Sequence, residues 1–328
     1  MSYDAHIRQY PAAKVFITSA YNDPEPISSF LEIAKLDKIK RHTLVDDPER
    51  ADIILFIENS RYHFDPFFRA LKRNYLVRMY PDKVYMYNPH DRPWFILKGL
   101  YACVPRRLYN SSLMAATPYI ETTNSFIRCD NEVDPKYLFS FMGSISSGIR
   151  KKIMSLTHSR GYLDDCKGES FGRHPLSSKM HYANLLSESK FVLCPKGFGP
   201  SSIRIFETMK AGRVPVIISD EWVGPPGLPW SDFSVFIPEN RVDEIPSILE
   251  KEEASWEAKA KLSRRIWEEN FASDTLFHYS INSLLGLKRS SNKNMNVYLR
   301  LNHSVAFLKY SFGKHVVKEL RSFLHFQI

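Results

Sequence analysis

The chain has 328 residues, 44% of them hydrophobic and 25% charged, so it can fill the cores of two ordinary domains and is not of the disordered class. The net charge of +9 favours an anionic partner, but no zinc-finger, RNA-recognition or helix-turn-helix pattern is present, so nucleic acid is not expected. The four cysteines lie far apart with no histidines at ligand spacing, so no metal is expected.

Strands and helices alternate in the first part of the chain. Predicted helices begin near Pro26 and at Asp65-Pro66, and the second ends at Arg73. The predicted strands are residues 14–19, 52–57, 75–79 and 84–87. This order predicts a doubly wound α/β domain over residues 1–133.

Residues 88–110 interrupt the alternation. They are rich in aromatic residues and in residues that end helices and strands, which predicts a loop on the rim of a binding cleft. Asp91 lies in this segment, while Glu58 follows a predicted strand and Asp65 opens a predicted helix. Ligands of such sheets bind beyond the carboxyl ends of the strands, so these carboxylates are candidate site residues. A cap on the turn before Arg92 is the alternative role of Asp91.

A second α/β domain is predicted over residues 134–288. It opens with a strand at 137–142 and a loop of small residues that could admit phosphate to the backbone and to Arg150. Residues 164–180 are predicted to form a loop, and residues 181–189 a helix. Further on, a strand is predicted at 233–237, a helix at 242–249 and a charged helix at 250–271.

The most informative stretch is residues 188–222. An apolar strand at 191–194, a loop at 195–200, a helix at 203–210 and a strand at 214–218 make a βαβ unit. Ser201 and Ser202 are expected to cap the helix, and Gly212 is expected to end it with a positive φ.

The start of this helix has the chemistry of an anion site. Its free N–H groups and positive dipole favour a phosphate, and Lys196, Gly197 and Arg204 lie beside them. Glu207 follows Arg204 by three residues and could accept the hydroxyls of a ribose. The alternative for the pair of Arg204 and Glu207 is an ordinary solvated ion pair.

The run CPKGFGPSSIRIFETMKAGRVPVIISDEW, followed by LPWSDFSVFIPENRVDEIPSIL, resembles the donor domain of the exostosin-type glycosyltransferases, glycosyltransferase family 47. The resemblance covers residues 139–249. It implies a GT-B-like α/β fold of two Rossmann-like domains facing across a cleft, a nucleotide-sugar donor, no required cofactor and transfer with inversion. In such folds a C-terminal helix commonly crosses back to the first domain.

On this resemblance residues 1–133 would bind the acceptor and residues 134–288 the donor. Arg150, Lys196, Gly197, Ser201, Ser202 and Arg204 would hold the diphosphate, Glu207 the ribose, and Asp220, Glu221 and Trp222 the sugar. Inversion needs a general base on the acceptor hydroxyl. Asp91 is the preferred base, with Glu58 and Asp65 as alternatives.

The predicted function is therefore transfer of a sugar, with a UDP-sugar as the favoured donor, to a glycan or glycolipid acceptor in polysaccharide or glycoconjugate synthesis. The alternatives are a fucosyltransferase-like enzyme that uses a GDP-sugar and a non-catalytic assembly protein on a membrane surface.

The last segment, residues 289–328, has apolar residues at helical spacing with basic residues between them. Such a helix can lie on an anionic membrane, or it can pack on its own protein. No apolar leader or span of about 18 apolar residues is seen, which favours a cytoplasmic protein, peripheral to a membrane if the tail binds one.

Overall fold

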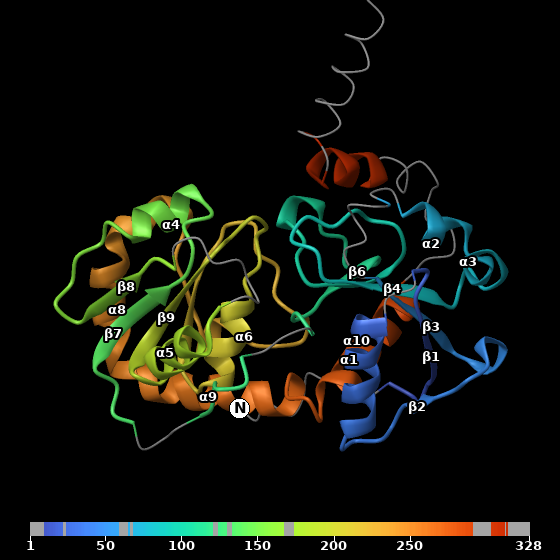
Figure 1. Ribbon diagram of the computed structural model, residues 1–328, viewed down its shortest axis with the longest axis horizontal. Helices are drawn as coiled ribbons and strands as arrows, with labels where there is room; N and C mark the ends of the chain where they lie inside the picture. The colour runs from blue at the N-terminus through green and yellow to red at the C-terminus, as the bar shows by residue number, and fades with distance from the viewer. Residues whose placement is uncertain are drawn as a thin grey trace, which may run out of the picture.

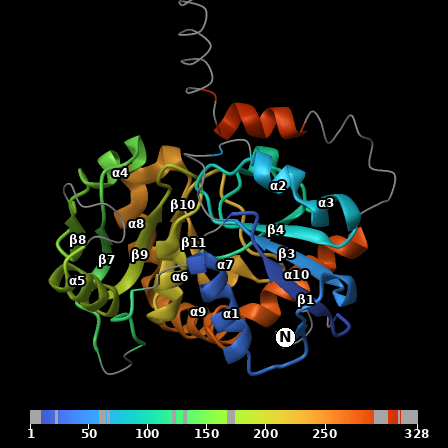
Figure 2. The same cartoon turned by 45° about the vertical axis from the view of Figure 1, so that its right-hand side comes forward.

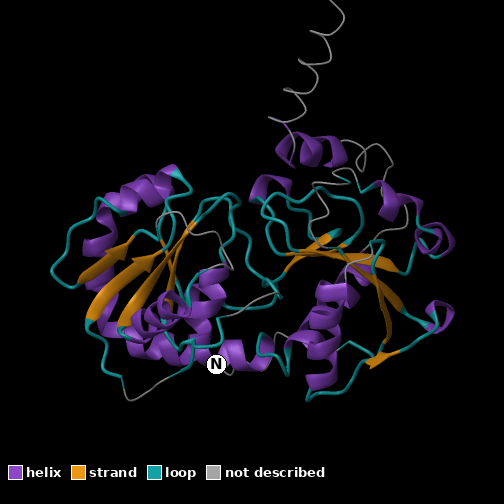
Figure 3. Cartoon of the chain, in the orientation of Figure 1, coloured by secondary structure: helices purple, strands orange, loops and turns teal. Residues whose placement is uncertain are grey.

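The structure is a computed structural model that describes residues 10–21, 24–58, 65, 68–120, 124–129, 133–166, 174–290, 303–311 and 313. Two α/β domains lie side by side, each built on a parallel sheet flanked by helices (Figures 1 and 3). The predicted fold class, a GT-B-like pair of Rossmann-like domains, is confirmed.

The first sheet has six parallel strands in the order β2-β1-β3-β4-β5-β6. They are β1 (Lys14–Thr18), β2 (Thr43–Leu44), β3 (Ile53–Ile57), β4 (Val84–Asn88), β5 (Gly99–Tyr101) and β6 (Met114–Ala116). All residues of β3 and β4 are buried, as expected for central strands covered on both faces. The strand order reverses between β1 and β3, which makes this the topological switch point where such sheets bind ligands.

The helices of this domain are α1 (Pro24–Leu36), α2 (Arg69–Arg73) and α3 (Tyr75–Met79), with a 3-10 turn at Pro48–Arg50 and another at Arg106–Leu108. The strand predicted at residues 75–79 is wrong, because the Asn74 side chain accepts the Leu76 amide and starts helix α3. The loop predicted at residues 88–110 contains β5. A Cβ at Gly99 would lie 1.8 Å from the Met86 carbonyl oxygen, so the absence of a side chain lets β5 approach β4.

The second sheet has five parallel strands in the order β11-β10-β9-β7-β8, with its switch point between β7 and β9. They are β7 (Tyr137–Met142), β8 (Gly161–Asp164), β9 (Ser189–Pro195), β10 (Val214–Ile218) and β11 (Val235–Phe236). Strand β8 was not predicted.

The helices around this sheet are α4 (Gly148–Ile153), α5 (Leu176–Ser187), α6 (Ile203–Lys210), α7 (Trp230–Phe233), α8 (Ile245–Glu252) and α9 (Trp256–Asn270). Two 3-10 segments, Glu239–Glu244 and Glu253–Ser255, flank α8. Helix α5 begins at Leu176, five residues before the predicted helix and inside the predicted loop.

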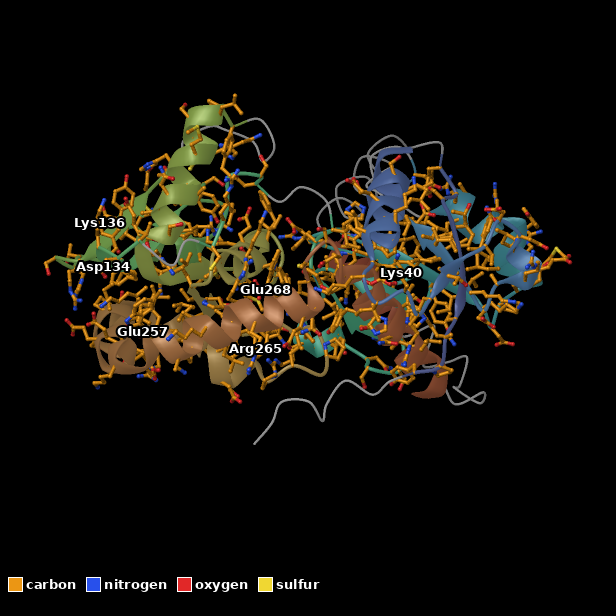
Figure 4. All side chains as sticks on the ribbon, turned by 90° about the horizontal axis from the view of Figure 1, so that it is seen from below. Lys40, Asp134, Lys136, Glu257, Arg265 and Glu268 are labelled. Atoms are coloured by element: carbon orange, nitrogen blue, oxygen red, sulfur yellow. The ribbon has the colours of Figure 1, made fainter. Side chains whose placement is uncertain are left out.

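Two consecutive helices join the domains. Helix α9 runs along the underside of the second domain, where Glu257, Arg265 and Glu268 project from it (Figures 1 and 4). Helix α10 (Leu276–Ser290) then packs on α1, β5 and β6 of the first domain. Its Phe277 meets Phe30 of α1 edge to face at 6.2 Å. Helix α10 therefore returns the chain to the first domain, as the resemblance implied, whereas residues 276–288 were predicted to belong to the second domain.

Residues 303–311 form a helix that lies over the first domain (Figure 2). Phe307 is fully buried there and packs against Phe95 at 5.9 Å between ring centres. The described part of the tail thus packs on its own protein, while residues 291–302, 312 and 314–328 lie outside the described residues. Within the described chain, no helix has the length and apolarity that a membrane span needs.

Candidate functional site

The central βαβ unit forms as predicted, with β9, α6 and β10 in sequence. Gly212 has φ +67° after the last turn of α6, the left-handed conformation expected of a helix-ending glycine. Ser202 is the N-cap residue of α6, but its side chain makes no capping hydrogen bond. Ser201 and Ser202 are both buried. The two hydroxyls therefore lie at the helix start without the predicted capping bond.

Arg204 is directed from α6 to the switch point of the second sheet. Its Nη2 donates to the carbonyl oxygen of Met142, at the end of β7, over 2.6 Å. The guanidinium lies 4.7 Å from the centre of the Phe141 ring. The side chain is 8% exposed, and its Nε is buried with no hydrogen-bond partner among the described residues. A buried donor without a partner is costly, so this geometry leaves one N–H of Arg204 unused inside the site.

Arg150 reaches the same switch point from α4. Its Nε donates to the Lys196 carbonyl oxygen over 3.1 Å and its Nη1 to the Ser144 carbonyl oxygen over 3.0 Å. A Cβ on Gly197 would lie 3.1 Å from Arg150 Nη2, so this glycine lets the guanidinium approach the loop backbone. Arg150 is thus held by carbonyl groups rather than by a carboxylate.

The two guanidinium groups form a cationic centre between the carboxyl ends of β7 and β9. Desolvation, followed by repulsion from Arg204, lowers the pKa of Arg150 to about 10. Among the described residues, neither arginine has a carboxylate within ion-pair distance. Two like charges held together without a counter-ion favour binding of an anion at this point.

Lys196 is already paired. Its Nζ lies 2.5 Å from Oε2 of Glu239, and the other oxygen of Glu239 accepts the Asp220 amide. The Asp220 carboxylate in turn accepts the Glu239 amide over 3.1 Å. Lys196 and Asp220 therefore belong to one small network on the rim of the site, beside the arginine pair.

Glu207 is buried and accepts a 2.8 Å hydrogen bond from the Tyr182 hydroxyl. Burial raises the pKa of Glu207, although the bond from Tyr182 and the charge of Arg204 lower it in part. The solvated ion pair of the alternative interpretation is therefore not what the structure shows. Whether Glu207 holds a ribose stays a prediction.

Glu221 and Trp222 join the two domains. Arg107 of the first domain donates to Glu221 Oε1 over 2.7 Å, and Arg106 Nη2 donates to the Trp222 carbonyl over 3.0 Å. Trp222 is 3% exposed, and its ring packs against Trp230 at 4.9 Å. The Trp222 ring is therefore part of the core and not placed to frame a sugar, which corrects the prediction for this side chain.

Asp91 lies in the first domain, on the side that contacts the second domain. Its Oδ1 accepts a 2.8 Å hydrogen bond from the Tyr119 hydroxyl. Desolvation raises the pKa of Asp91, while Tyr119, the charge of Arg150 and the charge of Arg92 lower it in part. The residue itself is solvent-exposed. Asp91 is thus a carboxylate of the first domain within electrostatic reach of the cationic centre.

The loop 195–200 brings these groups together. A Cβ on Gly199 would lie 2.1 Å from the Asp91 carbonyl oxygen and 2.4 Å from Cys103 Sγ. The Ser201 amide donates to the same sulfur over 3.2 Å, and Arg92 Nε donates to the Phe198 carbonyl. The loop at the start of α6 therefore rests directly on the first domain.

The other two candidate carboxylates are engaged elsewhere. Glu58 is fully buried at the switch point of the first sheet and accepts the Ala20 amide, and burial raises its pKa to about 8. Asp65 accepts hydrogen bonds from the Tyr21 hydroxyl and the Ala70 amide. Partial burial would raise its pKa, but these bonds outweigh it and lower the pKa. Neither carboxylate faces the arginine pair as Asp91 does.

Sequence reasoning missed Tyr119, Tyr182, Cys103 and the pair of Arg106 and Arg107. Each lies outside the quoted motif, and nothing in its local sequence indicates a contact across the fold. Within the described residues, no three His, Cys, Asp or Glu side chains are grouped as a metal site would need.

Comparison with known proteins shows what this part of the chain is similar to. Residues 105–251 match the family model described as the Exostosin GT47 domain. The match includes all five strands of the second sheet and both arginines of the cationic centre. The resemblance predicted from the sequence is confirmed.

Several curated proteins are similar to parts of the chain. A probable glucuronosyltransferase of Oryza sativa subsp. japonica is 38% identical over 185 residues, which are 55% of this chain and 39% of that protein. The exostosin-1 homolog of Caenorhabditis elegans is 29% identical over 157 residues, 40% of each. A probable beta-1,4-xylosyltransferase of Arabidopsis thaliana is 38% identical over 88 residues, 25% of this chain and 21% of that protein. The chain thus spans well under half the length of these relatives.

Solved structures show only remote likeness. An α1,3-fucosyltransferase is 12% identical with a TM-score of 0.43, covering 91% of this chain and 93% of that chain. Anabaena HepE in complex with UDP is 9% identical with a TM-score of 0.34, covering 88% and 99%.

Proposed function

We propose that this chain, whose residues 105–251 match the Exostosin GT47 domain, is a glycosyltransferase that moves a sugar from a nucleotide-diphosphate donor to a glycan or glycolipid acceptor. The observation that carries the proposal is the pair of Arg150 and Arg204 at a topological switch point, two guanidinium groups that make no ion pair with a carboxylate in the described part of the chain. The second domain would bind the donor, and the first domain the acceptor.

The arginine pair suits a diphosphate leaving group. Negative charge develops on the diphosphate as the bond to the sugar breaks, and fixed positive groups in a dry site stabilise that charge. The unused Nε of Arg204 and the free amides at the start of α6 supply donors that need no rearrangement. The residues supply this charge without a metal or cofactor, and we propose that none is required.

We propose a UDP-sugar as the donor, on the family resemblance. The names of the relatives include glucuronosyltransferases and a xylosyltransferase, so UDP-glucuronic acid and UDP-xylose are the first donors to test.

We further propose that transfer inverts the anomeric centre, with Asp91 as the general base. The residue Asp91 is exposed, it lies within electrostatic reach of Arg150 of the other domain, and its pKa is raised. By contrast, Glu58 is fully buried, and the pKa of Asp65 is lowered. A carboxylate that takes a proton from an acceptor hydroxyl works better when its pKa lies closer to the working pH.

Binding of nucleotide diphosphates tests the donor site. Calorimetry with UDP and GDP should show binding to the wild-type protein, and Arg204→Gln and Arg150→Gln should each weaken it by about 10- to 100-fold, the loss of one charged hydrogen bond. Arg78→Gln is the matched control, because Arg78 is an exposed arginine on α3.

Three results are decisive in this experiment. Unchanged affinity in both variants would remove the arginine pair from the donor site. Tighter binding of GDP than of UDP would replace the proposed donor with a guanosine one. Absence of binding by any nucleotide diphosphate would overturn the proposed function.

A further inference from the structure

The helix of residues 303–311 is seated on one segment of the first domain, residues 91–108. The Trp94 indole donates to the Ser304 carbonyl oxygen over 3.3 Å, and Nε2 of His303 lies 2.7 Å from the Leu108 carbonyl oxygen. Phe307 is fully buried between these contacts. The helix therefore touches the segment near both of its ends as well as through an apolar centre.

The last turn of this helix reaches the residue proposed as the base. The Tyr310 hydroxyl donates to the Asp91 carbonyl oxygen over 3.4 Å, and the Ser311 hydroxyl donates to the Pro93 carbonyl oxygen. On the other side, the Asp91 carboxylate accepts from Tyr119. Main chain and side chain of Asp91 are thus held by two different tyrosines.

The same segment forms the contact with the donor domain. Arg92 donates to Phe198, Cys103 accepts from Ser201, and Arg107 pairs with Glu221. The guanidinium of Arg107 also lies 5.5 Å from the centre of the Tyr310 ring. Residues 91–108 are therefore clamped between helix 303–311 on one side and the loop before α6 on the other.

From this arrangement we infer that helix 303–311 is a brace of the transfer site and that Tyr310 is a positioning residue for Asp91. The inference rests on the proposed function, with Asp91 as the base. Tyr310 touches no reacting atom in this role. It fixes the main chain of Asp91, so that the carboxylate stays opposite the arginine pair.

The positioning role matters because the rate of transfer is sensitive to small displacements of the general base. A base displaced by about 1 Å can lose about 100-fold in rate, although the donor still binds. Asp91 lies between β4 and β5, outside any strand or helix, so no regular ladder of hydrogen bonds holds it. The bonds from Tyr310 and Ser311 supply that restraint from a part of the chain more than 200 residues away.

The test compares three variants of the full chain. Tyr310→Phe removes the hydroxyl and keeps the ring, and Phe307→Ala loosens the whole helix. Val305→Ala is the matched control, because Val305 lies on the same helix with 59% of its surface exposed. Each variant is measured by hydrogen exchange of the amides in residues 91–108, by UDP affinity, and by kcat and KM for donor turnover.

Tyr310→Phe should lower kcat by about 10-fold with the KM for donor and the UDP affinity unchanged, as a small displacement of the base requires. Exchange near Asp91 should rise in Tyr310→Phe, and across residues 91–108 in Phe307→Ala, while Val305→Ala matches the wild type. Unchanged kcat and exchange in Tyr310→Phe would remove Tyr310 from this role. Unchanged exchange in Phe307→Ala would overturn the brace itself.

The exchange measurement separates this inference from the proposed function. If the wild-type protein binds no nucleotide diphosphate and turns over no donor, the proposed function fails, and the positioning role of Tyr310 fails with it. Exchange in Phe307→Ala then still shows whether helix 303–311 restrains residues 91–108.

Discussion

At the residue scale, the two switch points carry opposite chemistry. Glu58, buried and acidic, occupies the switch point of the first sheet, whereas Arg150 and Arg204 occupy that of the second. Both sites lie where a parallel sheet offers space and free amides to a ligand. Among the described residues the basic pair lies at the second switch point, so an anionic donor is expected there.

Glu58→Gln should make stability less dependent on pH. Burial raises the pKa of Glu58 from 4.5 to about 8, so the folded state keeps a proton that the unfolded state loses above pH 4.5. Stability of the wild type should therefore fall by up to about 1.4 kcal/mol per pH unit as pH rises from 4.5 to 8. Glutamine still accepts the Ala20 amide. Denaturant unfolding at pH 5 and pH 8 measures this, and an equal pH dependence in both proteins would contradict it.

Tyr119→Phe should shift the acid limb of the pH profile. The Tyr119 hydroxyl stabilises the charged form of Asp91, so its removal raises the pKa of Asp91 further. Because a base works only when deprotonated, kcat/KM should fall off at a higher pH than in the wild type. An acid limb that stays in place, or moves to lower pH, would show that Asp91 is not the base. Tyr109→Phe is the control, since Tyr109 lies outside this hydrogen bond.

At the element scale, the loop between β9 and α6 both leads into the helix and contacts the first domain through Gly199. The sequence predicted the loop from its glycines and prolines. It did not predict the contact, because the partners Asp91 and Cys103 are about a hundred residues away and carry no local signal.

Gly199→Ala should disturb this contact. The new Cβ would lie 2.1 Å from the Asp91 carbonyl oxygen, so either the loop or the first domain must move, at a cost of about 1–3 kcal/mol. Gly148→Ala is the matched control, because a Cβ there meets nothing within 4 Å. Urea unfolding and UDP affinity would be compared in the two variants. Equal stability in both would mean that the domains do not press on each other at this loop.

At the scale of the whole molecule, α10 fixes the first domain to the rest of the chain. Beyond its apolar face, it places His278 against His42, with ring centres 5.0 Å apart, and Asn282 beside them. Asp37 and Arg41 are the charged groups that face this pair. Both ring nitrogens of His42 are buried.

The histidine pair should make the molecule acid-sensitive. Burial lowers the pKa of His42 from 6.5 to about 4, so between these values the unfolded state binds a proton that the folded state does not. Stability should be complete above pH 6.5 and fall by up to about 3 kcal/mol towards pH 4. His42→Phe keeps a stacked ring without titrating, so its unfolding free energy should depend less on pH in this range. An identical dependence would assign the acid sensitivity to other groups.

Prediction from the sequence succeeded where the signal was local. The strands at 191–194 and 214–218 and the positive φ of Gly212 follow from apolar runs and a helix-ending glycine. It failed at residues 75–79, where the capping side chain of Asn74 starts a helix in place of the predicted strand. It also failed at β8, a strand that was not predicted. Prediction from the sequence also assigned Trp222 to the sugar site, but the Trp222 ring packs against Trp230 in the core.

By itself, the sequence determined that two α/β domains would form and that basic residues would lie beside the start of the helix at 203–210, because hydrophobic period and helix-ending residues are properties of neighbouring residues. Only the tertiary structure decided that Asp91 faces Arg150, that Tyr119 holds its carboxylate and that helix 303–311 lies on residues 91–108. These contacts join residues far apart in the chain, and their energy comes from burial and hydrogen bonds that no local pattern records.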